Sequence, residues 1–202
     1  MQNLPQHLCP TGAFEIELQP GRHVALPLCH PKFNRWVGSP PTFTYGGKPV
    51  LEYEGKALFP ELVILHLLQE RGWDGVWVSS YGGVKFLRDM PQDASLSNAI
   101  ILPPERRVLF DRIQAAGESK GGCFDVMAWY DDLVLFLEAK RHGHDKLRVS
   151  QRRWINGALS IGLATDALMI VEWESRDRSA VKLTATRHGP PDNGVTVGPF
   201  LS

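Results

Sequence analysis

The sequence has few of the features that mark secreted or membrane proteins. Its 202 residues include only three cysteines, Cys9, Cys29 and Cys123, and this odd, scattered set does not suit a disulfide scaffold. No apolar run approaches the ~20 residues of a membrane span, and residues 1–10 lack the apolar stretch of a signal peptide. We therefore expect a cytoplasmic protein with no membrane partner.

The chain also lacks an overall excess of charge. It has 22 basic and 22 acidic residues, so no global field indicates a nucleic-acid partner. One window, residues 140–153, does carry an excess. It sets a single acid, Asp145, against six basic residues: Lys140, Arg141, Lys146, Arg148, Arg152 and Arg153. Such a run is typical of a solvated helix face, and its position beside a reactive site would favour a binding role instead.

With 43% apolar residues, the chain can bury one sizeable core. The first part is rich in proline and glycine and has only short strand-like runs, such as 14–18 and 23–28, which predict one hairpin. The predicted division is an irregular N-terminal extension over 1–55, a core over 56–175 with an insertion at about 81–121, and a C-terminal edge strand (180–186) and tail with a loop at 190–191 over 176–202.

Apolar patterning in the core predicts alternating helices and strands. Helices are expected over 60–71, 104–116 and 146–161, and strands over 75–80, 124–130, 133–140 and 167–173. The last strand–helix–strand unit implies a right-handed parallel crossover. The fold class is therefore α/β, with a mixed central sheet flanked by helices.

Particular residues are expected to orient and bound two of these helices. Asp145 is expected to cap the helix over 146–161, and Gly162 to end it. The inner face of the helix over 104–116 is expected to be Val108, Leu109, Ile113 and Ala116.

A tight turn is expected to bring two acids together. If Asp131 and Asp132 form a two-residue hairpin turn, Asp125 lies directly opposite Glu138 on the same face of the sheet. Lys140, two residues further along, shares that face. Opposed like charges destabilise a strand pair unless they are compensated, either by a buried ion pair with the lysine or by a divalent cation such as Mg²⁺.

The helix over 146–161 supplies a further polar group. Its inward stripe is apolar except for Gln151, and a buried amide needs hydrogen-bond partners. We expect the amide to lie either beside the two acids or against backbone groups of the core. Arg148 and Arg152 lie beside this stripe and could hold backbone phosphates.

These residues resemble the motifs of the PD-(D/E)XK nuclease superfamily, most of all its VRR-NUC branch. The matching segments are Gly122-Cys123-Phe124-Asp125, Glu138-Ala139-Lys140 and Gln151-Arg152-Arg153-Trp154. Two features depart from the family pattern: Phe124 replaces a proline, and the segment 81–121 is longer than a minimal core needs.

The resemblance implies a restriction-endonuclease-like core and a role for each matching residue. Asp125 and Glu138 would bind Mg²⁺ or Mn²⁺ with the carbonyl of Ala139, Lys140 would serve the attacking water, and Gln151 would support the site. Glu61 matches a glutamate on the first core helix of many members. It equally suits the first turn of a helix, where an acid favours the helix dipole.

The leading hypothesis is therefore a metal-dependent nuclease that hydrolyses DNA, including branched or structured DNA, either as a monomer or as a homodimer. Its nucleic-acid contacts are expected from Arg141, Lys146, Arg148 and Arg152. The alternatives are a non-catalytic nucleic-acid-binding or assembly subunit, and a hydrolase of small phosphoesters.

Two weaker patterns involve histidine and cysteine. His142 and His144 follow Lys140 and could contact phosphate or a transition metal, although a solvated exit from the strand is favoured. A zinc site is disfavoured, because no tight ligand spacing joins its candidates, His7, Cys9, His23, Cys29 and His30.

Overall fold

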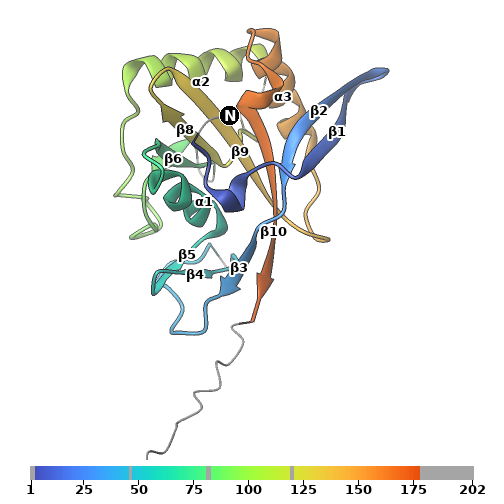
Figure 1. The fold of residues 1–202 in the computed structure, drawn as a ribbon. Helices are drawn as coiled ribbons and strands as arrows, with labels where there is room; N and C mark the ends of the chain where they lie inside the picture. The colour runs from blue at the N-terminus through green and yellow to red at the C-terminus, as the bar shows by residue number, and fades with distance from the viewer. Residues whose placement is uncertain (1–2, 46, 81–82, 119–120, 178–202) are drawn as a thin grey trace, which may run out of the picture.

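The computed structural model describes residues 3–45, 47–80, 83–118 and 121–177. These described residues form a mixed, mostly antiparallel sheet of ten strands and three α-helices (Figure 1). The predicted α/β class with a mixed, helix-flanked sheet is confirmed. The edge strand and loop expected at 180–186 and 190–191 lie outside the described residues.

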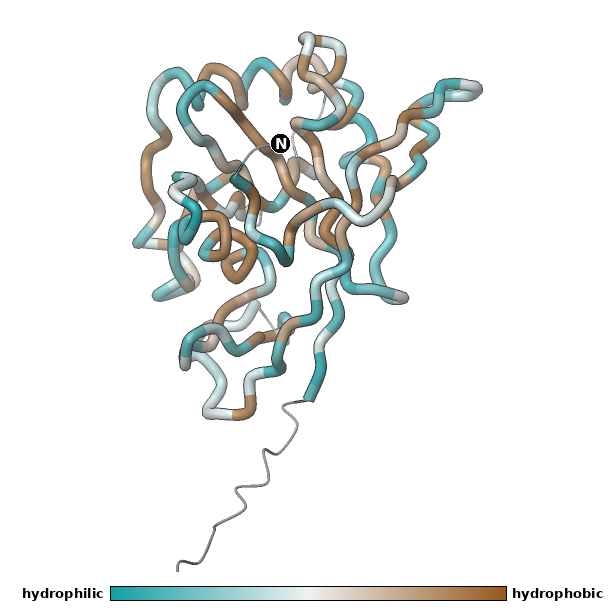
Figure 2. Tube along the Cα trace, viewed as in Figure 1, coloured by the Kyte–Doolittle hydropathy of each residue, from teal (hydrophilic) through white to brown (hydrophobic). Residues whose placement is uncertain are grey.

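The buried middle of the sheet consists of β8 (Val126–Tyr130), β9 (Leu133–Arg141) and β10 (Leu168–Arg176). β9 pairs antiparallel with β8 and parallel with β10, as the crossover predicts. β6 (Asp74–Ser79) and β7 (Lys85–Leu87) extend the sheet beyond β8. The central strands and the helix α1 carry the most apolar segments of the chain (Figure 2), because they are covered by other elements.

Three helices cover the sheet. α1 (Pro60–Gln69) has proline at its first position, which suits a helix start, and it is buried on nearly all sides. α2 (Pro104–Ala116) and α3 (Val149–Ser160) pack together in a second core, where Trp154 stacks on Phe124. Within the described ranges, none of the helices is both long enough and apolar enough to span a bilayer.

The predicted inner face of α2 is partly wrong. Phe110 and Ile113 are buried, whereas Val108 is 58% exposed and Ala116 is also exposed. The ring of Phe110 sets the rotation of the helix, because it packs edge-on against Phe86 with ring centroids 5.3 Å apart. Val108, two positions before Phe110 on the helix, then points to the opposite side.

The N-terminal segment is more ordered than the sequence indicates. The hairpin is confirmed as β1 (Gly12–Gln19) and β2 (Arg22–Cys29), and it projects from the body of the protein (Figure 1). The expectation of an otherwise irregular extension over 1–55 is corrected, because β2 and then β3 (Lys32–Arg35) pair parallel with β10. The remaining elements of this part are η1 (Gln6–Leu8), β4 (Leu51–Tyr53) and β5 (Lys56–Leu58).

The turn between β8 and β9 has the predicted two residues. Tyr130 pairs with Leu133, and the register continues without a shift as far as Val126 with Leu137. Asp131 adopts a left-handed backbone with φ of 50°, a conformation that aspartate tolerates better than most residues. The next position in this register places Asp125 opposite Glu138.

The start of α3 differs from the prediction. Asp145 does not cap the helix; its carboxylate accepts the backbone N–H of Arg141 at 2.9 Å and closes the turn after β9. The helix begins at Val149, with Arg148 as its N-cap. Its end is as expected, because Gly162 takes a φ of 95° just after the last turn. A short 3₁₀ turn, η2 (Thr165–Ala167), leads into β10.

Candidate metal centre

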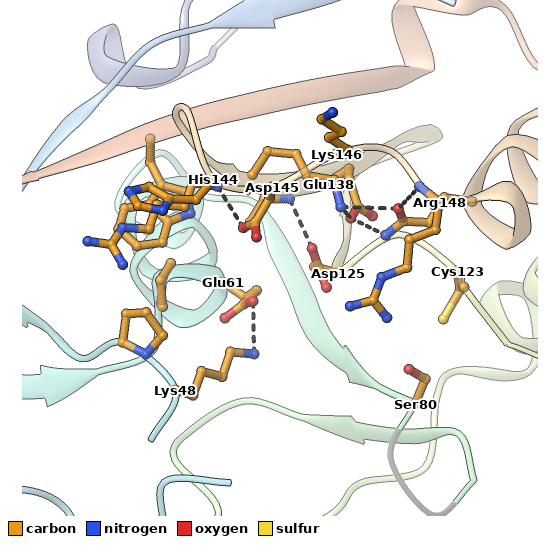
Figure 3. A pocket seen from close by; sticks show the side chains of 18 of the residues that line it. Lys48, Glu61, Ser80, Cys123, Asp125, Glu138, His144, Asp145, Lys146 and Arg148 are labelled. Atoms are coloured by element: carbon orange, nitrogen blue, oxygen red, sulfur yellow. Dashed lines mark hydrogen bonds and ion pairs between the residues drawn. The ribbon is translucent and has the colours of Figure 1, made fainter. Parts of the chain in front are cut away.

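All of the predicted site residues except Arg152 line one open cavity of about 760 Å³. Its walls come from the end of β9, the start of α3, the first turn of α1 and the loop before β4. Its charged lining consists of five basic residues, Lys48, Lys140, Arg141, Lys146 and Arg148, and four acidic residues, Glu61, Asp125, Glu138 and Asp145 (Figure 3). Positive and negative groups are therefore nearly balanced around the cavity.

Glu138, Lys140 and Gln151 form a connected polar group. The Lys140 Nζ lies 2.7 Å from Glu138 Oε1 and donates to Gln151 Oε1 at 3.1 Å. The Gln151 Nε2 donates to Glu138 Oε1, while its Oε1 also accepts the backbone N–H of Arg148 at 2.9 Å. Gln151 thus joins the start of α3 to β9, which is the first of the two positions expected for this amide.

Asp125 lies beside this group, immediately before the first residue of β8. Its carbonyl accepts the backbone N–H of Val78 at 2.7 Å, and its Oδ2 accepts the backbone N–H of Ala139 at 3.0 Å. Burial, and then the nearby Glu61 carboxylate, raise the pKa of Asp125 to about 6, although Lys48 and Lys140 oppose the shift. The nearby Glu61 carboxylate therefore disfavours the charged form of Asp125.

The pKa of Glu138 is raised as well. Burial is the main cause, and the neighbouring Asp125 carboxylate is the second, while Lys140 acts in the opposite direction. The prediction that the hairpin brings Asp125 and Glu138 within electrostatic reach of each other therefore agrees with the geometry. Both carboxyl groups would gain from a further positive charge in the cavity.

Glu61 and Lys48 form the opposite wall of the cavity (Figure 3). Glu61, at the first turn of α1, is 7% exposed. Its Oε1 lies 2.8 Å from the Nζ of Lys48, which also sits 4.9 Å from the ring centroid of Trp77. Burial lowers the pKa of Lys48, but Glu61 and Asp125 raise it by more, so its pKa lies above the usual value.

Sequence reasoning missed Lys48. It stands alone in a proline- and glycine-rich loop between β3 and β4, with no motif around it. Only the folding of residues 1–55 against α1 brings it to the acids. A signal that could have found it is the need of a buried Glu61 for a cationic partner.

Two buried carboxylate oxygens lack partners within the described part of the chain. They are Glu138 Oε2 and Glu61 Oε2, and both residues line the cavity together with Asp125 and Ala139. Buried carboxylates normally have their oxygens satisfied, and clustered carboxylate and carbonyl oxygens are the ligands that hard divalent cations prefer. The donor set therefore fits a Mg²⁺ or Mn²⁺ ion.

The basic residues divide into two groups. Arg141, Lys146 and Arg148 line the cavity, as expected for residues that would hold a phosphate backbone. Arg152 does not belong with them, because its Nη1 donates to the carbonyl of Glu17 in β1 at 2.6 Å. The expected contact of Arg152 with a substrate is therefore corrected to a contact that docks the N-terminal hairpin on α3.

Compared with family models, with curated proteins and with solved structures, the chain has no match. Its function must therefore be inferred from the geometry of this cavity.

Proposed function

We propose that the protein is a Mg²⁺- or Mn²⁺-dependent nuclease that hydrolyses DNA phosphodiester bonds on a restriction-endonuclease-like core. One observation carries the proposal. Three carboxylates from separate segments, Glu61, Asp125 and Glu138, face one cavity beside Lys140, and two of them have a buried oxygen that finds no partner among the described residues. This combination of hard oxygen donors and a neighbouring ammonium suits phosphoryl chemistry.

The residues that would hold the metal are Asp125, Glu138, the carbonyl of Ala139 and, from the opposite wall, Glu61. When bound, such an ion supplies polarisation of a phosphate oxygen and makes a water more acidic. It would also relieve the repulsion that raises the pKa of Asp125 and Glu138.

Lys140 is the residue proposed to orient the attacking water. An ammonium has three N–H donors, and two of them are directed at Glu138 and Gln151. The third can hold a water in the cavity. Gln151 acts through Lys140, because its amide fixes both the lysine and the glutamate in place.

Lys48 is proposed to stabilise charge on the phosphate. Its pKa is raised, so it stays cationic at neutral pH and is unsuited to accept a proton. A fixed cation facing the reacting group lowers the barrier where negative charge develops. Arg141, Lys146 and Arg148 extend positive charge along the rim of the cavity, which favours a polyanion over a small phosphoester.

A second candidate is a nucleic-acid-binding or assembly subunit that does not cleave. The observation that favours it is the pair of internal ion pairs, Lys140 with Glu138 and Lys48 with Glu61. These pairs neutralise two of the three carboxylates without any metal. A protein that uses the cavity only for binding would need no more than this.

A cleavage panel separates the two candidates. The full chain is incubated with linear, flapped and four-way DNA in Mg²⁺, in Mn²⁺ and in EDTA, beside Asp125→Asn, Lys140→Ala and Gln151→Ala. We expect cleavage with either metal and a loss of about 10²-fold or more in Lys140→Ala. Lys85→Ala is the matched control, since Lys85 is an exposed strand lysine outside the cavity lining.

Two results would contradict the proposal. Equal cleavage by wild type, Asp125→Asn and Lys140→Ala would mean that the activity belongs to a contaminant. Binding that persists in EDTA, without cleavage of any DNA form in either metal, would favour the second candidate.

A further inference from the structure

A second group of ligand-type side chains lies outside the carboxylate cavity. It consists of His30, His142 and Glu172, whose candidate ligand atoms all lie within 4.8 Å of one another. The Nδ1 of His30 is 3.2 Å from Glu172 Oε2, and the Nδ1 of His142 is 3.3 Å from the same oxygen. The three residues come from three segments far apart in the sequence.

The backbone holds these three residues in place. Glu172 lies on β10 and pairs with Lys140 of β9, while the preceding residue pairs with Cys29 of β2. On one side, the backbone N–H of His142 donates to the Trp173 carbonyl at 2.9 Å. On the other side, the N–H of Glu174 donates to the Pro31 carbonyl at 3.1 Å, next to His30. The two histidines are therefore fixed on either side of one carboxylate.

A simple ion pair accounts for only part of this arrangement. Both imidazoles approach the same oxygen, Glu172 Oε2, at 3.2 and 3.3 Å from separate segments. A cation placed between two neutral imidazoles and the carboxylate uses all three groups at once.

The distances also suit a metal ion. In a tetrahedral zinc site, ligands about 2.0–2.1 Å from the metal lie about 3.3 Å from one another. The two measured contacts to Glu172, 3.2 and 3.3 Å, are already at that separation. The other ring nitrogen of His142 lies 3.8 Å from Glu174 Oε1, a distance longer than a hydrogen bond.

We propose that His30, His142 and Glu172 form a site for Zn²⁺ or a similar borderline divalent ion, separate from the carboxylate cavity. Two imidazoles and one carboxylate favour such ions over Mg²⁺, which prefers oxygen ligands alone. The two histidine side chains are 47% and 53% exposed, so solvent or an added ligand can occupy the fourth position. The ion would tie the end of β2 to β9 and β10. This inference does not rest on the proposed nuclease function.

The test is Zn²⁺ binding to the full chain by calorimetry, with the melting temperature as a second measurement. We expect Zn²⁺ to raise the melting temperature, and we expect this rise, unlike any rise that Mg²⁺ produces, to be lost when the group is mutated. His30→Ala, His142→Ala and Glu172→Gln should each weaken Zn²⁺ binding about tenfold or more. His23→Ala is the matched control, because His23 is also exposed and near a glutamate, Glu17, but lies outside the group.

Further variants locate the ion if it binds. Asp125→Asn and Cys9→Ser should keep the affinity of the wild type, since neither residue belongs to the group. Circular dichroism in EDTA establishes that each variant is folded, and His142→Gln replaces His142→Ala if the alanine variant is not. Zn²⁺ affinity unchanged in all three ligand variants, no Zn²⁺ binding by the wild type, or loss of binding in Asp125→Asn instead would each overturn the proposal.

Discussion

Asp125 is a residue at which charge and burial conflict. Its raised pKa, about 6 against an ordinary value of 3.8, arises first from burial and then from Glu61. For an acid, a folded-state pKa above the unfolded one means that the folded state binds the proton more tightly. The stability contributed by that proton is complete below about pH 4 and is lost as the pH rises through about 6.

Removing this charge should therefore stabilise the metal-free protein. We expect Asp125→Asn to raise the free energy of unfolding at pH 7 in EDTA by up to about 3 kcal/mol. The asparagine Oδ1 can still accept the N–H of Ala139. The gain should shrink towards zero between pH 6 and pH 4, as measured by urea denaturation across that range.

A variant at the hairpin tip provides the comparison. Asp132→Asn removes an exposed carboxylate and should change the free energy of unfolding by less than about 0.5 kcal/mol at either pH. A gain for Asp125→Asn that is the same at pH 4 and pH 7 would show that charge is not its cause.

Lys48 belongs to the same electrostatic balance. Without the lysine, the buried Glu61 carboxylate has neither oxygen paired, since Oε2 already lacks a partner among the described residues. We expect Lys48→Met to lower the free energy of unfolding by about 1–3 kcal/mol. Adding Glu61→Gln should recover part of that loss, because the uncompensated charge is then gone.

The corresponding control is Lys32→Met. Lys32 also pairs with a glutamate, Glu174, but both side chains are largely exposed, and such pairs contribute about 0–1 kcal/mol. Urea denaturation of the three variants beside the wild type gives the comparison. Equal losses for Lys48→Met and Lys32→Met would contradict the role assigned to burial.

At the scale of elements, local sequence patterns predicted how the residues around the site are arranged. Side chains alternate between the two faces of a strand, and the two-residue turn fixes which residues of β8 and β9 pair. The positions of Asp125 and Glu138 therefore followed from counting residues outward from the turn. The stripe containing Gln151 followed from helical spacing. Both depend only on neighbours in the sequence.

Two other features were not predicted from the sequence, for different reasons. Asp145 was expected to cap α3, but the turn after β9 uses its carboxylate instead. Arg152 was expected to hold phosphate, yet its side chain donates to the Glu17 carbonyl in β1. For Asp145 the competing partner, the Arg141 N–H, is only four residues away, and the preference of aspartate for capping does not choose between the two local partners. For Arg152 the partner lies in β1, about which helical periodicity carries no information.

The contact between α2 and α3 positions Gln151 and depends on a glycine. A Cβ added at Gly157 would lie 2.6 Å from the Ile113 carbonyl oxygen and 2.7 Å from the Gly117 Cα. These are backbone atoms, which cannot rotate away. Alanine ordinarily favours a helix interior over glycine by about 1 kcal/mol, but here the overlap should dominate.

We therefore expect Gly157→Ala to destabilise the protein by about 1–3 kcal/mol. Gly12→Ala is the control, because a Cβ there meets nothing within 4 Å, and its effect should stay within about 0.5 kcal/mol. Thermal unfolding of both variants measures the difference. A stabilised Gly157→Ala would mean that the two helices separate at little cost.

For the whole molecule, the N-terminal segment is part of the fold and of the site. It adds β2 and β3 to the edge of β10 and supplies Lys48 to the cavity. Its role could not be predicted from the sequence, because its strands are short and their partner is more than a hundred residues away. Parallel pairing between such distant segments depends on tertiary contacts rather than on local pattern.

The zero net charge of the chain limits how it can bind DNA. Sequence-independent affinity scales with the number of phosphates that basic residues neutralise, and the logarithm of affinity falls with the logarithm of salt concentration by about 0.9 per phosphate. The rim of the cavity offers Arg141, Lys146 and Arg148. If these three make the contacts, the slope should be about −3.

The measurement is a salt titration of DNA binding by Asp125→Asn in EDTA. The variant and the chelator are both used so that the DNA is not cleaved during the titration. Adding Arg148→Glu should weaken binding and bring the slope about 1 closer to zero. Arg112→Glu makes the same charge change at an exposed position on α2, outside the cavity lining, and should leave the slope unchanged. A slope steeper than about −6, or equal effects of the two reversals, would mean that DNA contacts a surface other than this cavity.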